Sequence, residues 1–144
     1  MVFMTGSAVD GKLRSARVAR LATRDPEGRP HVVPVCYAYD GRAVYTAVDQ
    51  KPKRTSPERL ARVRNIRACP DVVLLLDQYD EDWDKLWYIL VRGHGEILPT
   101  GEEQRQALQQ LRAKYEQYLS LDLLPVDAPV IRIKPTEIVS WGRF

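Results

Sequence analysis

Alternating apolar and polar positions in the first third of the chain predict three strands joined by short turns. Residues 17–23 alternate charged or small side chains with apolar ones, and residues 31–39 and 42–48 are rich in β-branched and aromatic residues. The sequence Asp25-Pro26-Glu27-Gly28 is a strong turn signal, because proline fixes φ and glycine tolerates a positive φ. Asp40-Gly41 predicts a tight hairpin turn. We therefore expect an antiparallel meander.

Three further segments predict strands in the rest of the chain. Residues 71–76 form a short, continuous apolar run that is typical of a strand buried on both faces. Residues 86–98 predict a long strand that bends at Gly93 and Gly95, where glycine permits a β-bulge. Residues 130–141 predict the final strand. Six antiparallel strands with few helices favour a small closed or split barrel.

Three helices are expected beside this sheet. Residues 9–16 predict a short helix, with Asp10 at its N-cap. Residues 56–68 predict a second helix that Ser56 caps. The third is expected to begin at a Thr100 cap and to run to about Leu119. The predicted fold class is mainly β with flanking helices: a six-stranded antiparallel split β-barrel of the FMN-binding type.

Length and composition limit the possible classes of protein. A chain of 144 residues fits one domain over residues 1–144, and no apolar run approaches the roughly 20 residues that span a bilayer. Cys36 and Cys69 lack metal-ligand spacing, and neither His31 nor His94 has ligating neighbours, so we expect no metal site. With no charged leader and with both thiols reduced, the cytoplasm is the expected location.

The excess of positive charge is confined to one segment, which runs from Lys51 to Arg67. It carries seven basic side chains and a single acid, Glu58, although the formal net charge of the whole chain is only +3. Because this segment leaves a predicted strand and enters a predicted helix, it is well placed to bind a phosphate. A solvated helix face is the alternative interpretation. Nucleic-acid binding is not expected, because residues 51–67 contain no aromatic side chain for stacking.

Two other features are candidates for ligand contact. Pro34 cannot donate to a β-ladder, so it marks an edge strand, a bulge or a place where a ligand replaces a strand. Trp87 could line a pocket, although such residues are more often core or interface anchors. The chain has no nucleophile elbow and no Walker or Rossmann glycine motif, so we expect no hydrolase built on side-chain acid and base.

Taken together, several motifs resemble those of one protein family. They are Ala19-Arg20-Leu21-Ala22-Thr23, the stretch from Asp25 to Val35, Tyr45-Thr46-Ala47-Val48-Asp49, Lys51-Pro52-Lys53-Arg54-Thr55, Arg64-Asn65-Ile66, and Tyr79-Asp80-Glu81-Asp82-Trp83 with Leu86-Trp87. Their order and spacing resemble the flavin-reductase-like split barrels of the pyridoxamine 5'-phosphate oxidase class. Within that class, the chain resembles the branch of deazaflavin (F420) dependent enzymes.

This resemblance implies a homodimer in which each of two cofactor sites is built from both chains. Neither a nucleic acid nor a membrane is expected as a partner. It implies a cofactor ring in an interface groove and a cofactor phosphate in a basic pocket. The residues that it assigns to the cofactor are Pro34, Val35 and Cys36 beside the ring, Thr46 and Ala47 on the adjacent strand, Lys51, Lys53, Arg54 and Thr55 at the phosphate, Arg64 on the following helix, and Trp87 on the strand that closes the groove.

The resemblance departs from true pyridoxamine-phosphate oxidases at the C-terminus. Residues 138–144 lack the arginine-rich substrate motif of those enzymes, so vitamin B6 oxidation is not the expected reaction. The basic segment fits FMN and F420 equally well, but the polyglutamate tail of F420 would favour its extra lysines and arginines. We expect hydride transfer between F420 and a small organic substrate, with FMN as the alternative cofactor. A non-catalytic module that binds flavin, F420 or haem is the other alternative.

Overall fold

Seven strands form one antiparallel sheet in the computed structural model, which describes residues 6–48, 60–120 and 123–144. The strands are β1 (Ala19–Arg24), β2 (Pro30–Val35), β3 (Ala38–Tyr39), β4 (Val44–Ala47), β5 (Asp71–Gln78), β6 (Trp87–Leu98) and β7 (Val130–Gly142). The helices are α1 (Ser7–Ser15), α2 (Ala61–Ala68) and α3 (Glu102–Lys114), with short 3-10 turns at Trp83–Lys85 and Glu116–Leu119. The predicted fold class, a mainly β split barrel with flanking helices, is confirmed.

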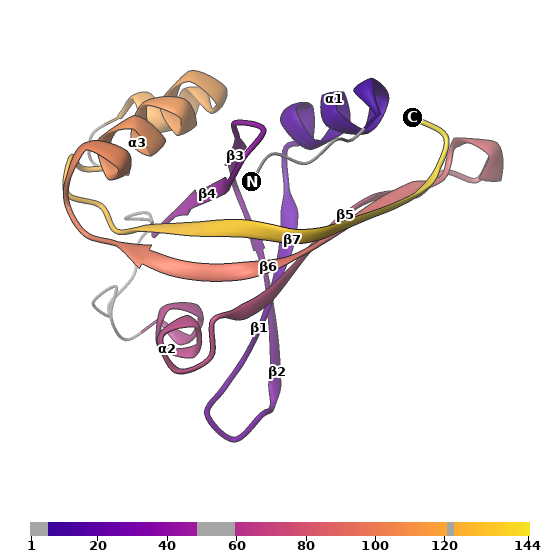
Figure 1. Ribbon diagram of the computed structural model, residues 1–144. Helices are drawn as coiled ribbons and strands as arrows, with labels where there is room; N and C mark the ends of the chain where they lie inside the picture. Colours follow the sequence, from indigo (N-terminus) through magenta and orange to yellow (C-terminus); the bar gives the residue numbers. More distant parts are fainter. Residues whose placement is uncertain (1–5, 49–59, 121–122) are drawn as a thin grey trace.

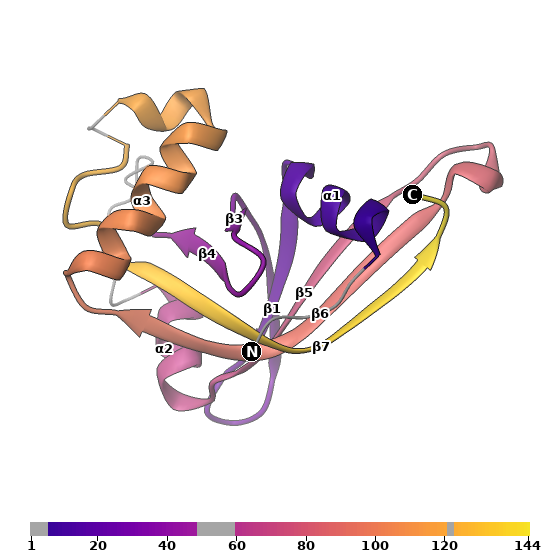
Figure 2. The ribbon, with the colours of Figure 1, turned by 45° about the horizontal axis from the view of Figure 1, so that its top comes forward.

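The sheet curls because its two edge strands are neighbours in the sequence. The strand order is β2-β1-β5-β6-β7-β4-β3, so β2 and β3 lie at opposite ends, yet only Cys36 and Tyr37 separate them. Three peptide units span at most roughly 11 Å, so the two edges must meet at this point. Figures 1 and 2 show the resulting half-open curl. The strand predicted at 31–39 is therefore two strands, which raises the count from six to seven.

Two apolar clusters occupy the two faces of the curled sheet. The first lies inside the curl, where Leu21, Val44 and Ile131 meet Leu13 of α1 and Ile66 of α2. Helices α1 and α2 lie on opposite sides of β6 and β7 in both ribbon views (Figures 1 and 2). The second cluster lies between α3 and the outer face of β3, β4 and β7, and includes Tyr45, Leu111 and Val130.

The predicted starts of all three helices were wrong. Helix α1 begins after Gly6, and Asp10 lies inside it, where its carboxylate pairs with Arg14 at 2.8 Å. Leu60 is extended and precedes α2, so the described helix starts later than Ser56; residues 56–59 lie outside the described part of the chain. Helix α3 begins after Gly101 rather than at a Thr100 cap.

The other end of α3 was predicted too late, and Tyr115 explains the difference. Its backbone is extended, which ends the α-helix at Lys114. The Tyr115 hydroxyl accepts a hydrogen bond from the Tyr37 amide at 3.1 Å and donates one to the Arg17 carbonyl at 2.9 Å. These bonds connect the end of α3 to the segments beside β1 and β3, which a continuing helix could not do.

No helix within the described residues is long and apolar enough to cross a membrane.

Candidate functional site

A β-bulge between β6 and β7 shapes the outer face of the sheet. Arg92 pairs with Glu137 and the next residue, Gly93, pairs with Pro135, so Thr136 is the extra residue of the bulge. The Thr136 hydroxyl donates to the Arg92 carbonyl at 3.3 Å. A Cβ at position 93 would lie 2.5 Å from the Lys134 carbonyl oxygen, so only glycine fits. The bulge at Gly93 confirms the prediction made from its glycine, and bulges of this kind often lie beside functional sites.

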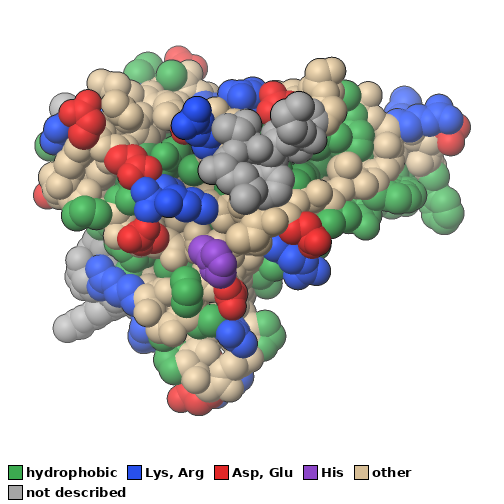
Figure 3. Space-filling view, viewed as in Figure 1, with side chains coloured by type: hydrophobic (Ala, Val, Ile, Leu, Met, Phe, Trp, Pro, Cys, Tyr) green, Lys and Arg blue, Asp and Glu red, His purple; other side chains and the backbone are tan. Residues whose placement is uncertain are grey.

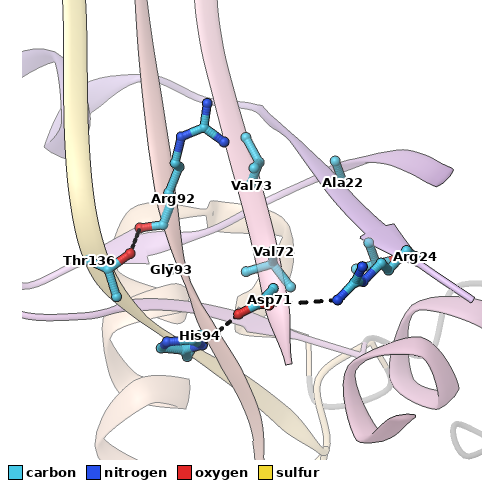
Figure 4. A pocket seen from close by; sticks show the side chains of 10 residues that line it. Ala22, Arg24, Asp71, Val72, Val73, Arg92, Gly93, His94 and Thr136 are labelled. Carbon is cyan, nitrogen blue, oxygen red and sulfur yellow. Dashed lines mark hydrogen bonds and ion pairs between the residues drawn. The ribbon is translucent and has the colours of Figure 1, made fainter. Parts of the chain in front are cut away.

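A pocket of about 480 Å³ opens beside this bulge, and we call it the bulge pocket. Its lining residues come from four strands: Ala22, Thr23, Arg24, Asp71, Val72, Val73, Arg92, Gly93, His94 and Thr136. Ala22 and Val73 are paired across β1 and β5 and supply small apolar side chains to its floor. Figure 4 shows charged side chains around this floor.

One carboxylate connects two of the charged groups at the rim of the bulge pocket. Asp71 Oδ1 lies 3.0 Å from Nδ1 of His94, and its Oδ2 lies 3.8 Å from a guanidinium nitrogen of Arg24. Figure 4 shows Asp71 between these two side chains. Arg24 also donates through Nε to the Cys69 sulfur at 2.7 Å, and this contact raises the pKa of Arg24 above its usual range. On the other side of the pocket, Arg92 pairs with Glu137 at 3.1 Å.

Helix α2 is fixed to the sheet directly beneath this pocket. The side-chain amide of Asn65 donates to the Thr23 hydroxyl at 3.0 Å, and both side chains are buried. Val63 and Ile66 pack into the barrel core from the same helix, while Arg64 and Arg67 are exposed. The end of the basic segment is thus held close to β1 by one buried hydrogen bond and two apolar contacts.

A second pocket, of about 500 Å³, lies between α3 and the outer face of β4 and β7; we call it the α3 pocket. It is lined by Asp40, Arg42, Ala43, Tyr45, His94, Glu103, Arg132, Lys134, Pro135 and Thr136. Glu103 is engaged inside it: Arg132 donates to it at 2.6 Å and the Tyr45 hydroxyl at 2.9 Å. These donors lower the pKa of Glu103, whereas burial raises that of Tyr45.

The predicted ring-contacting residues do not share one face of the chain. Pro34 is exposed on the outer face of edge strand β2, which confirms its edge position, while Val35 points into the core. Thr46 is buried, and its hydroxyl donates to the Cys36 carbonyl at 2.7 Å. Ala47 packs in the cluster beneath α3.

The remaining predicted site residues divide into two groups. Trp87 is 7% exposed and packs in the barrel core against Phe144, with ring centroids 5.6 Å apart. Trp87 lies at one end of β6. Leu98, at the other end, is the residue of β6 that the strand register places nearest to the end of β4. Lys51, Lys53, Arg54 and Thr55 lie outside the described residues. None of the described candidates lines the bulge pocket or the α3 pocket.

Sequence reasoning did not assign Arg24, Asp71, His94 and Thr136 to a site, and these residues line the bulge pocket. They are far apart in the chain, and only the strand register brings them together. The available signals were Gly93, which predicted the bulge, and the acid that directly follows Pro70 at the start of β5. Neither signal identifies His94 as the partner of Asp71.

Comparisons with solved structures find the same fold in proteins of several kinds. An F420 reductase is 23% identical over 94% of this chain and 98% of its own, with a TM-score of 0.71. HutZ, the haem storage protein from Vibrio cholerae, is 16% identical over 96% and 95%, with a TM-score of 0.72. A FAD-binding protein from Mesorhizobium loti is 22% identical over 95% and 94%, with a TM-score of 0.68.

A comparison with curated proteins finds no significant sequence match. The sequence pattern of one family matches residues 6–142, which is nearly the whole chain. The order of its motifs, the curled antiparallel sheet and this match agree: the chain belongs to the pyridoxamine 5'-phosphate oxidase family.

Proposed function

We propose that this protein is an oxidoreductase that binds a tricyclic redox cofactor and transfers a hydride between that cofactor and a small organic substrate. The observation that carries the proposal is the bulge pocket. Its floor is small and apolar, with the side chains of Ala22 and Val73 beside the bare backbone of Gly93, and it offers a flat ring a surface without obstruction. Arg24, Arg92 and His94 at the rim place positive or ionisable groups where a reduced ring gains negative charge. The volume is in the range of ordinary cofactor sites.

We further propose F420 as the cofactor, with FMN as the alternative. Both carry a phosphate near the ring, and the basic segment from Lys51 to Thr55 would bind it in either case. The polyglutamate tail of F420 carries additional negative charges. Arg64 and Arg67 are both exposed on α2, and they would bind these charges if the tail runs along this helix. An F420 reductase among the proteins of the same fold supports this choice.

A homodimer would complete the site. The outer face of the sheet exposes a row of apolar side chains across β5, β6 and β7, namely Leu75, Leu90 and Val139, with Val73 and Val32 beside it. In Figure 3, hydrophobic side chains gather toward the end of the β5–β6 hairpin. A second copy packed on this face would bury the row and bring its own residues to the cofactor groove.

A cofactor carrier without catalysis is the second candidate function. The haem storage protein of the same fold supports this second function. A carrier would need the same apolar floor and basic rim in the bulge pocket as the proposed enzyme. The two functions differ in one measurable property, because a carrier binds the cofactor but does not pass electrons to an acceptor.

The first test is a titration of the cofactor-free protein with F420 and, separately, with FMN, followed by fluorescence. We expect one of them to bind with a Kd in the micromolar range or below, and binding of neither would overturn the proposal. Lys53→Ala and Arg54→Ala should each weaken binding by roughly 1–3 kcal/mol, which is about 5- to 150-fold. Arg105→Ala, which removes the same charge from the exposed side of α3, is the matched control and should leave the Kd unchanged.

The second test separates enzyme from carrier. The protein is loaded with reduced cofactor under anaerobic conditions and mixed with menadione or 2-cyclohexen-1-one, two soluble hydride acceptors. Reoxidation of the bound cofactor faster than of free cofactor indicates an enzyme. Equal rates with and without protein would favour the carrier.

A further inference from the structure

The bulge pocket and the α3 pocket share two residues, His94 and Thr136. Both residues project from the outer face of the sheet, one from β6 and one from the bulged segment of β7. They therefore form the boundary between two hollows of similar volume, about 480 and about 500 Å³. If one hollow holds the cofactor ring, the other is the adjoining space in which a second molecule can approach it.

The imidazole of His94 is oriented at this boundary by Asp71. Nδ1 of His94 lies 3.0 Å from Oδ1 of Asp71, which places a proton on Nδ1 and turns Nε2 away from the carboxylate. Asp71 is itself held by Arg24. The His94 side chain is 59% exposed, so solvent can return a proton to it. The carboxylate of Asp71 thus positions Nδ1, and Nε2 lies on the other side of the ring.

The acids of the α3 pocket have other partners. Glu103 binds Arg132 and Tyr45, and the Asp40 carboxylate accepts from the amides of Arg42 and Ala43 at 2.8 Å each. The charged and titratable groups that face His94 from the neighbouring elements are Arg24 of β1, Asp71 of β5, Arg92 of β6, Lys134 and Glu137 of β7, Arg42 and Asp40 of the β3–β4 turn, Tyr45 of β4 and Glu103 of α3.

From this geometry we propose that His94 is a catalytic residue that donates the proton accompanying hydride transfer, to a substrate bound in the α3 pocket. This inference rests on the proposed function. A reduced cofactor, when bound, would supply a hydride to the electrophilic carbon of an unsaturated substrate and would itself be oxidised. The π-electron pair of the substrate bond moves to the neighbouring atom, which takes a proton from Nε2 of the His94 imidazolium. Asp71 is a positioning residue, and solvent reprotonates His94 afterwards.

Stopped-flow reoxidation of the cofactor-loaded dimer by 2-cyclohexen-1-one, whose reduction needs one hydride and one proton, tests the proposal. The rate for wild type should fall as the pH rises, because only the imidazolium can donate. His94→Ala, compared with wild type when both are fully loaded with cofactor, should lose this dependence and about 100-fold or more in rate, the usual effect of a general acid. Added imidazole should restore part of the rate. His31→Ala, which removes the other histidine of the chain, should keep the wild-type pH dependence.

A second measurement determines the tautomer of His94 beside Asp71 in the absence of turnover. The ¹⁵N spectrum of the imidazole should show the tautomer protonated at Nδ1, and Asp71→Asn should reduce its population. An unchanged rate and pH dependence in His94→Ala, or a His94 imidazole that is protonated at Nε2 when neutral, would overturn this proposal while the proposed function stands. Failure of the wild-type protein to bind cofactor or to reduce the enone would overturn both.

Discussion

Asn65 of α2 donates a buried hydrogen bond to Thr23 of β1 across 3.0 Å, directly beneath the bulge pocket. We expect Asn65→Ala to lower the free energy of unfolding by about 1–3 kcal/mol, because the substitution leaves the buried Thr23 hydroxyl without this donor. Urea denaturation followed by tryptophan fluorescence measures the change. Arg64→Ala, at the exposed neighbouring position, should change stability by less than about 0.5 kcal/mol. Equal effects of the two substitutions would contradict the anchoring role.

Gly93 is expected to resist replacement by any larger residue. A Cβ there would lie 2.5 Å from the Lys134 carbonyl and 2.9 Å from the Ile133 side chain, so Gly93→Ala should cost roughly 1–3 kcal/mol or deform the bulge. The same substitution at Gly11 in α1, where no atom lies within 4 Å, should instead stabilise by about 0.5–1 kcal/mol. Thermal unfolding of the two variants distinguishes the cases; a tolerated Gly93→Ala would show that the bulge can rearrange.

Lys114 should make stability rise with pH above neutrality. Its ammonium lies 3.8 Å from the centre of the Tyr37 ring, and burial, together with nearby Arg17, lowers its pKa to about 8. Between pH 8 and the higher pKa of an unfolded lysine, the unfolded chain binds more protons than the native state. The free energy of unfolding contributed by this group therefore increases as pH rises through that window.

Denaturation between pH 7 and 9, where unfolded tyrosines are still largely protonated, measures this slope. Lys114→Met should remove it and raise stability most at the lower pH. Lys85→Met, an exposed lysine of the β5–β6 hairpin, is the control and should retain it. A Lys114→Met variant with the wild-type slope would show that the ammonium is not buried at a cost.

A charge on the outer sheet face should separate the proposed dimer. Leu75→Arg places a cation in the middle of the apolar row, opposite Leu90, and should convert the dimer to a monomer. Leu119→Arg makes the same change at a side chain that is 66% exposed beyond α3 and should leave the dimer intact. Light scattering on a sizing column reports the mass. A wild-type protein that is monomeric at tens of micromolar would refute the dimer.

Local patterns in the sequence predicted most of the strands, because each pattern reports on one element. Alternation identified β1, the β-branched and aromatic run at residues 42–48 identified β4, and Gly93 identified the bulge in β6. The division of residues 31–39 into β2 and β3 was not predictable, because it results from where the two ends of the sheet meet. The C-terminal end of α3 was missed for a similar reason, since Tyr115 leaves the helix to make long-range hydrogen bonds.

The candidate site was harder to predict than the fold. A run of basic residues is visible in the sequence, and it directed attention to the segment from Lys51 to Arg67. The Arg24–Asp71–His94 group has no such local signature, because its three members lie at an end of β1, at the start of β5 and within β6. Only the pairing of β1 with β5 and of β5 with β6 makes them neighbours.

The pairing of β4 with β7 has a consequence for synthesis of the protein. Ala47 pairs with Val130 and Val44 with Ile133, so a strand made early closes the sheet only with the last strand of the chain. Contacts between such distant parts form slowly, because the intervening chain must first be ordered. While β7 is still missing from a ribosome-bound chain, one edge of β4 therefore has no partner strand. The barrel can close only after β7 has emerged from the exit tunnel.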